Sequence, residues 1–366
     1  MSVYPWLYGG YFMSDISKLD KNFKVETTIE REGLRFFNVL DEPFKIYGLI
    51  RENDEWVRMP GAVAKEVSEG VYGLYRHTAG GRVRFVTDSP YIVIKAETKG
   101  AYQMPHIPQT GLGGFDLYRI TDTGERYVKT FIPKVPAEPS LEFVIDVCNF
   151  VGKGEFGYTI NFPLYCPVQQ LYIGLKEGCT LKQAPGYALE APIVYYGSSI
   201  TQGGCASRPG NSYQAMLTRH FNLDHVNLGF SGNGKGEPVM ADYIASLDMC
   251  AFVYDYDHNA PSIEHLRETH KPLFDKVRAA HPDIPIIMMS RPNLYVPVDA
   301  RTDVIRDTYN AAVAAGDKNV YFIHGMELLE MCNGDGTVDG THPNDLGFFS
   351  MYTRIAKELE KAFNKK

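Results

Sequence analysis

From about residue 186 onward, short apolar segments alternate with longer segments of helical periodicity, and no other feature restricts the fold as much. Because helical segments separate five apolar ones, we expect a parallel sheet of five strands with helices on both faces. The strands are expected at 193–196, 226–228, 250–255, 284–289 and 320–323, and the helices at 212–221, 238–247, 261–280 and 302–315. A closing helix is expected from the apolar stripe Phe348, Tyr352, Ile355, Leu359 and Phe363.

Residues 1 to about 185 show the two-residue alternation of β-strands instead. In the segment 141–147, apolar residues at every second position alternate with Glu142 and Asp146, and the segments 82–86 and 91–96 are also rich in β-forming residues. Turn-forming residues separate these runs, and no long helix is indicated. We therefore predict an all-β sandwich or jelly-roll. The length of 366 residues suits two domains, which we place at 1–185 and 186–366.

Charge and cysteine content narrow the range of partners. Lys and Arg total 37 against 44 Asp and Glu, a net charge of −7, so the basic surface that nucleic acids require is not expected. No run of about 18 apolar residues occurs, so a membrane-spanning helix is not expected either. The first 20 residues lack a basic segment followed by an apolar one, so we expect a cytoplasmic protein whose six cysteines are reduced. The expected partner is a small molecule, and the sequence does not indicate an oligomeric state.

The loops after the predicted strands carry most of the residues suited to chemistry. In parallel sheets the active site lies beyond the carboxyl ends of the strands, so these loops are where it should be sought. They supply a serine, glycine-rich backbone, an amide and an Asp-x-x-His pair. The four loops read Gly-Ser-Ser-Ile-Thr at 197–201, Gly-Phe-Ser-Gly-Asn-Gly at 229–234, Asp-Tyr-Asp-His-Asn at 255–259 and Asp-Gly-Thr-His-Pro-Asn at 339–344.

Each of these residues also has an ordinary structural interpretation. Ser199 could cap a helix, Gly232 could be a turn glycine and Asn259 could cap the helix that follows it. His342 could be an exposed loop residue and Asp339 a turn former. Their joint occurrence, in order, at successive strand ends favours a catalytic site.

That order resembles the motif blocks of the SGNH (GDSL-type) hydrolases, whose first block is typically Gly-Asp-Ser-Ile/Leu and whose last is Asp-x-x-His-Pro. The resemblance implies a flavodoxin-like, three-layer α/β domain. It implies that Ser199 is the nucleophile and that Asp339 and His342 complete a catalytic triad. It also implies an oxyanion hole formed by the backbone of Ser199, the backbone of Gly232 and the side chain of Asn259.

The resemblance covers roughly residues 190–366 and departs from the usual pattern at two points. Ser198 stands where an Asp usually precedes the nucleophile, and the third block reads Asp-His-Asn-Ala at 257–260 instead of Gly-x-Asn-Asp. Further upstream, Gly-Phe-Asp-Leu-Tyr at 114–118 resembles a Gly-x-Asp-Leu-Tyr motif of a β-sandwich found ahead of certain SGNH domains. This second resemblance agrees with the β-sandwich predicted from the alternation.

The chemistry of ester cleavage explains why these residue types are needed. A serine hydroxyl becomes an effective nucleophile when a neighbouring base removes its proton, and an imidazole such as that of His342 can do so near neutral pH. A carboxylate such as Asp339 can fix the tautomer of that imidazole. Fixed N–H donors then stabilise the oxyanion, each contributing about 3–4 kcal/mol in comparable enzymes.

From the resemblance we expect a serine esterase that hydrolyses short-chain acyl esters, acetyl esters of carbohydrates above all, without a cofactor. Tyr256, His258, Arg291 and Tyr295 lie beside strand ends and are candidate substrate contacts, and the Tyr- and Gly-rich segment 102–118 is a candidate to share the substrate pocket. Two alternatives stay open. The same triad could serve an acyltransferase, and a β-sandwich protein could bind carbohydrate without catalysis.

Two other motifs are incomplete. Residues 229–235 approach a phosphate-binding loop, but Gly236 stands where that loop needs a Ser or Thr. His265 and His270 are five residues apart and so do not share a helix face, and no His-Glu-x-x-His motif occurs. We therefore expect neither nucleotide binding nor a metal ion.

Overall fold

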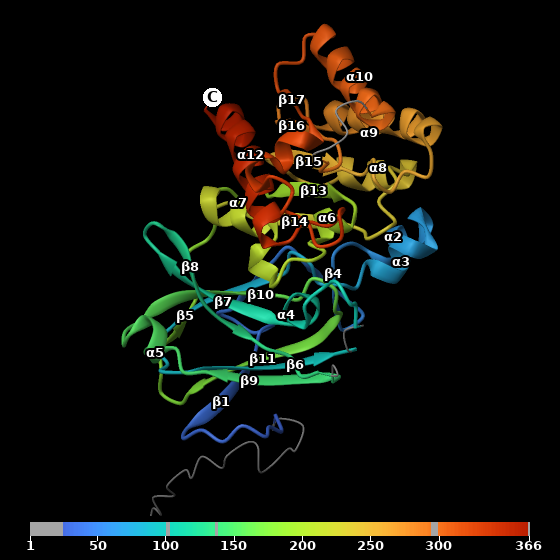
Figure 1. The fold of residues 1–366 in the computed structure, drawn as a ribbon. Helices are drawn as coiled ribbons and strands as arrows, with labels where there is room; N and C mark the ends of the chain where they lie inside the picture. Colours follow the sequence, from blue (N-terminus) through green and yellow to red (C-terminus); the bar gives the residue numbers. More distant parts are fainter. Residues whose placement is uncertain (1–24, 100–102, 136–137, 294–298, 365–366) are drawn as a thin grey trace, which may run out of the picture.

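The computed structural model describes residues 25–99, 103–135, 138–293 and 299–364. Figure 1 shows two parts, an N-terminal β domain and a C-terminal part in which helices surround a sheet. This arrangement confirms the predicted fold class, an antiparallel β domain followed by a parallel five-stranded α/β domain. Within the described residues, no helix combines the length and apolar character needed to cross a bilayer.

The N-terminal domain is a sandwich of two antiparallel sheets. Phe85 from one sheet and Ile94 and Ile173 from the other belong to a single buried apolar cluster between them. In order across the first sheet, the strands are β1 (Leu34–Asn38), β11 (Val168–Lys176), β6 (Ile92–Thr98) and β9 (Ser140–Ile145). In the second they are β12 (Leu181–Lys182), β5 (Arg82–Thr87), β10 (Phe156–Asn161), β7 (Phe115–Thr121) and β8 (Gly124–Phe131), with β2 (Lys45–Tyr47) also paired to β5. A separate hairpin consists of β3 (Ile50–Glu52) and β4 (Glu55–Val57).

The C-terminal sheet is parallel throughout. Its strands, in order across the sheet, are β14 (His225–Gly229), β13 (Ile193–Gly197), β15 (Ala251–Asp255), β16 (Ile286–Met289) and β17 (Val320–Ile323). Four of them are almost continuous apolar runs, as expected for strands covered on both faces, whereas β14 also contains His225 and Asn227. Gly197 pairs with both Gly229 and Asp255, so the loops that follow these three strands begin side by side at one edge.

Helices cover both faces of this sheet, each supplying an apolar stripe. One buried cluster contains residues of α8 (Pro238–Ala245), α9 (Ile263–Ala280) and α10 (Ala300–Ala314), and the other contains residues of α7 (Tyr213–Phe221), α11 (Gly325–Leu328) and α12 (Asp345–Phe363). Other short helical segments are α4 (Gln109–Leu112), α5 (Cys148–Val151), α6 (Ser199–Gln202), η2 (Pro209–Asn211) and η3 (Glu330–Cys332). Ends of the predicted strands and helices agree with the observed ones to within two residues. Helix α9 begins where Ser262 accepts a hydrogen bond from the His265 N–H, so Ser262 rather than Asn259 caps it.

Two short helices of the N-terminal half pack on the C-terminal domain. These are α2 (Gly61–Val67) and α3 (Glu69–Leu74), drawn in blue beside α8 in Figure 1. Ala64 and Val71 are fully buried in the same apolar cluster as Met240 of α8. These helices are not predicted from the sequence, because each is too short to show a clear helical period.

The Gly-Phe-Asp-Leu-Tyr segment at 114–118 joins the two parts. The Asp116 carboxylate is completely buried and accepts hydrogen bonds from the Asn161 side chain at 2.7 Å, Arg208 at 3.0 Å and the Gly210 N–H at 2.8 Å. Tyr118 also accepts a hydrogen bond from Arg208. Because Arg208 and Gly210 belong to the loop that follows α6, this motif fixes a loop of the C-terminal domain from the sandwich side.

Candidate active site

Ser199 is the first residue of α6, directly beyond the end of β13. The Ser198 hydroxyl accepts a hydrogen bond of 3.1 Å from the Ile200 N–H, so Ser198 caps this short helix. Gly197 must be glycine, because a Cβ there would lie 2.0 Å from the Asp255 carboxylate. The tight turn brings the Ser199 hydroxyl out at the sheet edge, within 2.9 Å of His342 Nε2.

His342 and Asp339 lie in the loop before α12 and contact each other directly. His342 Nδ1 is 2.8 Å from Asp339 Oδ2, while Asp339 Oδ1 accepts the N–H groups of His342 at 2.8 Å and Thr341 at 3.0 Å. Partial burial alone would raise the pKa of Asp339, but these hydrogen bonds outweigh it and lower the pKa to about 2. The structure therefore brings Ser199, His342 and Asp339 into one hydrogen-bonded chain with an ionised carboxylate at its end.

Gly232 lies in the loop that follows β14, in a conformation that favours glycine. Its φ is +71°, and it lies within a turn in which the N–H groups of Asn233 and Gly234 both donate to the Phe230 carbonyl. Among the described residues, no backbone hydrogen bond is made by the Gly232 N–H. That donor is therefore available to a ligand.

The Gly232 loop is held by residues that the sequence analysis did not single out. The Ser231 N–H donates to Gln202 Oε1 at 3.0 Å, which links the loop to α6 and hence to Ser199. The buried Arg58 guanidinium donates to the carbonyl oxygens of Asn227 and Gly229 and lies 4.4 Å from the Phe230 ring centroid. A lone arginine about 170 residues upstream carries no local sequence signal for such a role.

Asn259 lies in the turn after β15, where its N–H donates to the Tyr256 carbonyl at 3.0 Å. Its Oδ1 is buried and has no hydrogen-bond partner among the described residues. Beside it, Asp257 is fully buried, and its Oδ2 accepts the Arg291 N–H at 3.2 Å. Burial outweighs that hydrogen bond and raises the pKa of Asp257 to about 6.

The four candidate substrate contacts differ in their surroundings. Tyr256 is 1% exposed, and its hydroxyl is 2.8 Å from Thr269 Oγ1, so its side chain packs in the core instead of facing the loop edge. His258 is half-buried, and burial together with the nearby Arg291 and His342 lowers its pKa. Arg291 forms an ion pair of 2.5 Å with Asp299. Tyr295 lies outside the described residues.

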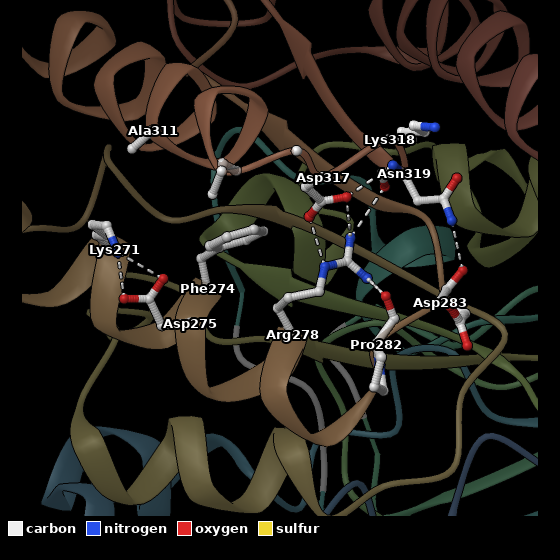
Figure 2. Close-up of a pocket in the computed structure, with 13 residues that line it drawn as sticks. Lys271, Phe274, Asp275, Arg278, Pro282, Asp283, Ala311, Asp317, Lys318 and Asn319 are labelled. Carbon is white, nitrogen blue, oxygen red and sulfur yellow. Dashed lines mark hydrogen bonds and ion pairs between the residues drawn. The ribbon is translucent and has the colours of Figure 1, made fainter.

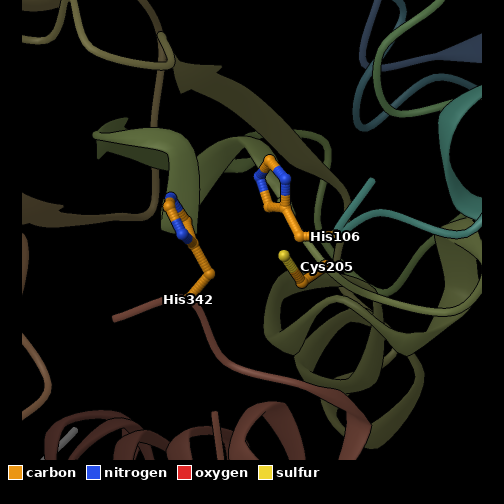
Figure 3. A group of neighbouring side chains, drawn as sticks. All are labelled: His106, Cys205 and His342. Carbon is orange, nitrogen blue, oxygen red and sulfur yellow. The ribbon is translucent and has the colours of Figure 1, made fainter. Parts of the chain in front are cut away.

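Two further side chains beside His342 were not predicted as site residues. The ring of His106 has its centroid 5.5 Å from that of His342, and Cys205 lies next to both. Figure 3 shows the two imidazole rings and the sulfur around a common space. His106 lies within the 102–118 segment of the β domain, so the sandwich supplies a residue next to the candidate base.

A separate hollow of about 560 Å³ lies between α9 and α10 and is shown in Figure 2. Asp283, Asp317 and Asn319 line it, and they precede β16 and β17. The hollow is therefore at the amino ends of the strands, whereas Ser199 is at the carboxyl ends. Four of its charged groups are already paired, Lys271 with Asp275 at 2.6 Å and Arg278 with Asp317 at 2.8 Å.

The arrangement at the carboxyl edge suits acyl transfer to a serine. It offers a hydroxyl bonded to an imidazole, an imidazole bonded to an ionised carboxylate, and N–H donors on two neighbouring loops. The six cysteines, which are all within the described residues, form no disulfide.

Comparison with known families divides the chain in two. Residues 190–360 match the model of the GDSL-like lipase/acylhydrolase family, and residues 34–181 match the model for the N-terminus of SGNH-hydrolase-type esterases. Among curated proteins, none matches the chain.

Several solved structures are similar over nearly the whole chain. A Bacteroides ovatus protein described as a GDSL-like lipase is 29% identical, with a TM-score of 0.80 over 90% of this chain and 98% of its own. A salicylyl-acyltransferase from a tetracycline biosynthetic pathway is 20% identical, with a TM-score of 0.73 over 91% of this chain and 98% of its own. An acetyl xylan esterase from the rumen bacterium Butyrivibrio proteoclasticus is 13% identical, with a TM-score of 0.57 over 90% and 99%. At 20% and 13% identity, the last two similarities show a shared fold alone.

Proposed function

Because the chain belongs to the GDSL-like lipase/acylhydrolase family and carries the N-terminal domain of SGNH-type esterases, we propose that it is a serine esterase that removes short acyl groups, acetyl above all, from carbohydrate esters. The observation that carries this proposal is the hydrogen-bonded chain from Ser199 through His342 to Asp339, with distances of 2.9 and 2.8 Å. We expect no cofactor, and we expect the protein to act in the cytoplasm.

In the proposed mechanism, Ser199 Oγ attacks the ester carbonyl while His342 Nε2 takes its proton. The Asp339 carboxylate holds the other ring N–H and stabilises the imidazolium that forms. The alcohol then leaves with the proton from His342, and an acyl group remains on Ser199. Water, activated by the same imidazole, releases the acid and restores the serine.

The oxyanion of each tetrahedral intermediate needs donors that are fixed before the reaction. We propose the N–H groups of Ser199 and Gly232 and the side-chain amide of Asn259. Two observations support these choices. The strands before these residues end in register, and neither the Gly232 N–H nor the Asn259 side-chain amide makes a hydrogen bond among the described residues.

The shared fold and the position of His106 support the proposed preferences for the alcohol and the acyl group. The fold is shared with carbohydrate esterases, which favours a sugar as the alcohol. His106 lies beside His342, so the β domain limits the space around the reacting ester on that side. We therefore propose a narrow pocket and a short acyl group. An acyltransferase would use the same acyl-enzyme, and the fold is also shared with one such enzyme.

The decisive experiment uses the full chain with a chromogenic acetyl ester. Ser199→Ala should lower kcat by about 10⁴–10⁶-fold, and an organophosphate should label Ser199 in the unchanged protein. Ser198→Ala is the matched control. It removes the neighbouring hydroxyl, which caps α6 but takes no part in the proposed reaction. The kcat should therefore fall less than tenfold. If Ser199→Ala retains more than a tenth of the kcat, Ser199 is not the nucleophile.

Chain length and acceptor tests define the substrate. The kcat/KM should fall steeply from acetyl to octanoyl esters, because a narrow pocket cannot accept the extra methylenes. An open apolar groove would give the opposite trend, with each buried CH₂ adding about 0.8 kcal/mol of binding. Adding free sugar acceptors during turnover distinguishes the two reactions, since only an acyltransferase would form the acylated sugar in preference to the acid.

A further inference from the structure

Three side chains that can bind a soft metal ion meet beside the candidate triad. One ligand atom each from His106, Cys205 and His342 lies within 4.8 Å of the other two. His106 comes from the sandwich domain, Cys205 from the loop after α6 and His342 from the loop before α12. Figure 3 shows that the three side chains converge although they are far apart in the sequence.

The backbone around Cys205 is built to hold the thiol in this place. Gly204 packs so closely that a Cβ there would lie 2.8 Å from the Tyr165 hydroxyl. Cys205 itself has a φ of +74°, a left-handed conformation that a residue with a Cβ seldom adopts. From the sandwich side, Thr110 Oγ1 donates to the Ser207 carbonyl at 2.5 Å and so fixes the same loop next to the segment that carries His106.

Two of the three groups have no other hydrogen-bond partner. Within the part of the chain that the structure describes, neither the His106 ring nor the Cys205 thiol makes a hydrogen bond. Cys205 is 3% exposed, while His106 and His342 are half-buried, so solvent ions can reach the cluster from the histidine side. The proposed ester chemistry uses His342 as the base and gives neither His106 nor Cys205 a part in proton transfer or bond formation.

We propose that His106, Cys205 and His342 form a Zn²⁺ site and that zinc bound there inhibits the enzyme. Asp339 holds His342 Nδ1 at 2.8 Å, so the metal takes Nε2, the atom that is 2.9 Å from the Ser199 hydroxyl. A metal on Nε2 removes the lone pair that accepts the serine proton. The inhibitory part of this inference rests on the proposed function, whereas the metal site itself does not.

Coordination chemistry favours zinc over the hard cations. Two imidazole nitrogens and a thiolate are typical zinc ligands, whereas Mg²⁺ and Ca²⁺ prefer oxygen. Tetrahedral bonds of about 2.0–2.3 Å place ligand atoms about 3.5 Å apart, so atoms within 4.8 Å need only small side-chain rotations. On binding, the Cys205 thiol loses its proton to solvent and its sulfur forms the bond to zinc, with water completing the fourth position.

The test measures inhibition and metal binding separately on the full chain. Ester hydrolysis is followed against buffered free Zn²⁺ for the unchanged protein, Cys205→Ser and His106→Ala, each relative to its own zinc-free rate. Cys332→Ser is the matched control, because Cys332 is equally buried at 3% exposure but lies outside the cluster. In parallel, Co²⁺ replaces zinc, and the thiolate-to-cobalt charge-transfer band reports a Cys ligand without any turnover.

We expect zinc to inhibit the unchanged protein and the control alike, and a chelator to restore activity. Loss of a ligand in Cys205→Ser or His106→Ala should raise the zinc concentration for half-inhibition at least tenfold. Even the mutation of residues that only hydrogen-bond to metal ligands lowers metal affinity by about 10–100-fold. The cobalt band should vanish in Cys205→Ser and persist in Cys332→Ser. His106→Ala is expected to fold, because its side chain is partly exposed, and so keeps the test valid if Cys205→Ser does not fold.

Equally strong inhibition by zinc in all four proteins, or a cobalt spectrum unaffected by Cys205→Ser, would overturn the site. A cobalt band that depends on Cys205, with no effect of zinc on ester hydrolysis, would keep the metal site and overturn inhibition through His342. Failure of the proposed function alone would show as absent esterase activity with the cobalt result intact.

Discussion

Replacing Asp339 with Asn tests how far the carboxylate drives the proposed catalysis. The change preserves shape but removes the charge that is 2.8 Å from His342 Nδ1. Both N–H donors to Asp339 bond to Oδ1, so the asparagine oxygen should stay there and its NH₂ should face His342. The ring would then carry its proton on Nε2, which faces Ser199 and could no longer act as a base.

The expected loss follows from two contributions. At 2.8 Å, the attraction between the carboxylate and the imidazolium is about 6 kcal/mol at an effective dielectric constant of 20 and about 1.5 kcal/mol at 80. The side chains of His342 and Asp339 are 22% and 39% exposed, so we take about 3 kcal/mol. Returning the ring to the reactive tautomer breaks a hydrogen bond at a cost of about 1–2 kcal/mol. The sum, about 4–5 kcal/mol, corresponds to a loss of about 10³–10⁴-fold in kcat.

The assay is the steady-state hydrolysis of an acetyl ester at pH 7, with kcat and KM determined separately. KM should change little, because the imidazolium exists only during the reaction. Asp335→Asn is the control, since it removes an exposed carboxylate from the same loop and should leave kcat within a factor of two. A loss of less than tenfold for Asp339→Asn, or an effect on KM alone, would refute this account of Asp339.

Three further predictions concern the oxyanion donor, metals and pH. Asn259→Ala should lower kcat by about 10²–10³-fold with little change in KM, because its hydrogen bond strengthens in the transition state; an effect on KM alone would make Asn259 a binding residue. Exhaustive chelation should not lower esterase activity, and a loss that Zn²⁺ restores would contradict the serine mechanism. The folded pKa of Asp257, about 6, lies above its unfolded value of about 3.9, so its stabilising contribution is complete below about pH 4 and is lost as pH rises through 6. Asp257→Asn lacks this titration, so its free energy of unfolding should rise relative to that of the unchanged protein by up to about 3 kcal/mol between pH 4 and 7. Urea titrations across this pH range measure the difference. If the free energies of the two proteins change in parallel with pH, this account of Asp257 is wrong.

Local patterns predicted most of the fold. Most strands of the C-terminal sheet are apolar runs, and helices such as α9 begin at residues with capping side chains, so both leave a signal in a short window of sequence. The carboxyl ends of parallel strands share one edge, so the strand order along the chain is enough to place Ser199, Gly232 and Asn259 near each other. Tyr256 shows the limit of that reasoning. It follows directly on β15, but its side chain turns into the core.

Long-range packing could not be predicted in this way. Arg58 supports the Gly232 loop, and His106 lies beside His342, yet neither residue sits in a periodic segment or a motif near its partner. Both positions follow from how the sandwich docks on the α/β domain. Docking depends on contacts such as that of Asp116 with Arg208, which become visible only in three dimensions.

The packing of α2 and α3 on the C-terminal domain affects how the chain emerges from the ribosome. The apolar side chains between Val57 and Tyr75 belong to one buried cluster with residues as far along the chain as Val320. At roughly 5–20 residues per second, synthesis of the intervening segment of about 245 residues takes roughly 12–49 s. During that interval the sandwich can fold, but this surface has no partner. The nascent chain therefore exposes an apolar surface for many seconds. We expect the yield of folded protein to depend on chaperones that cover this surface.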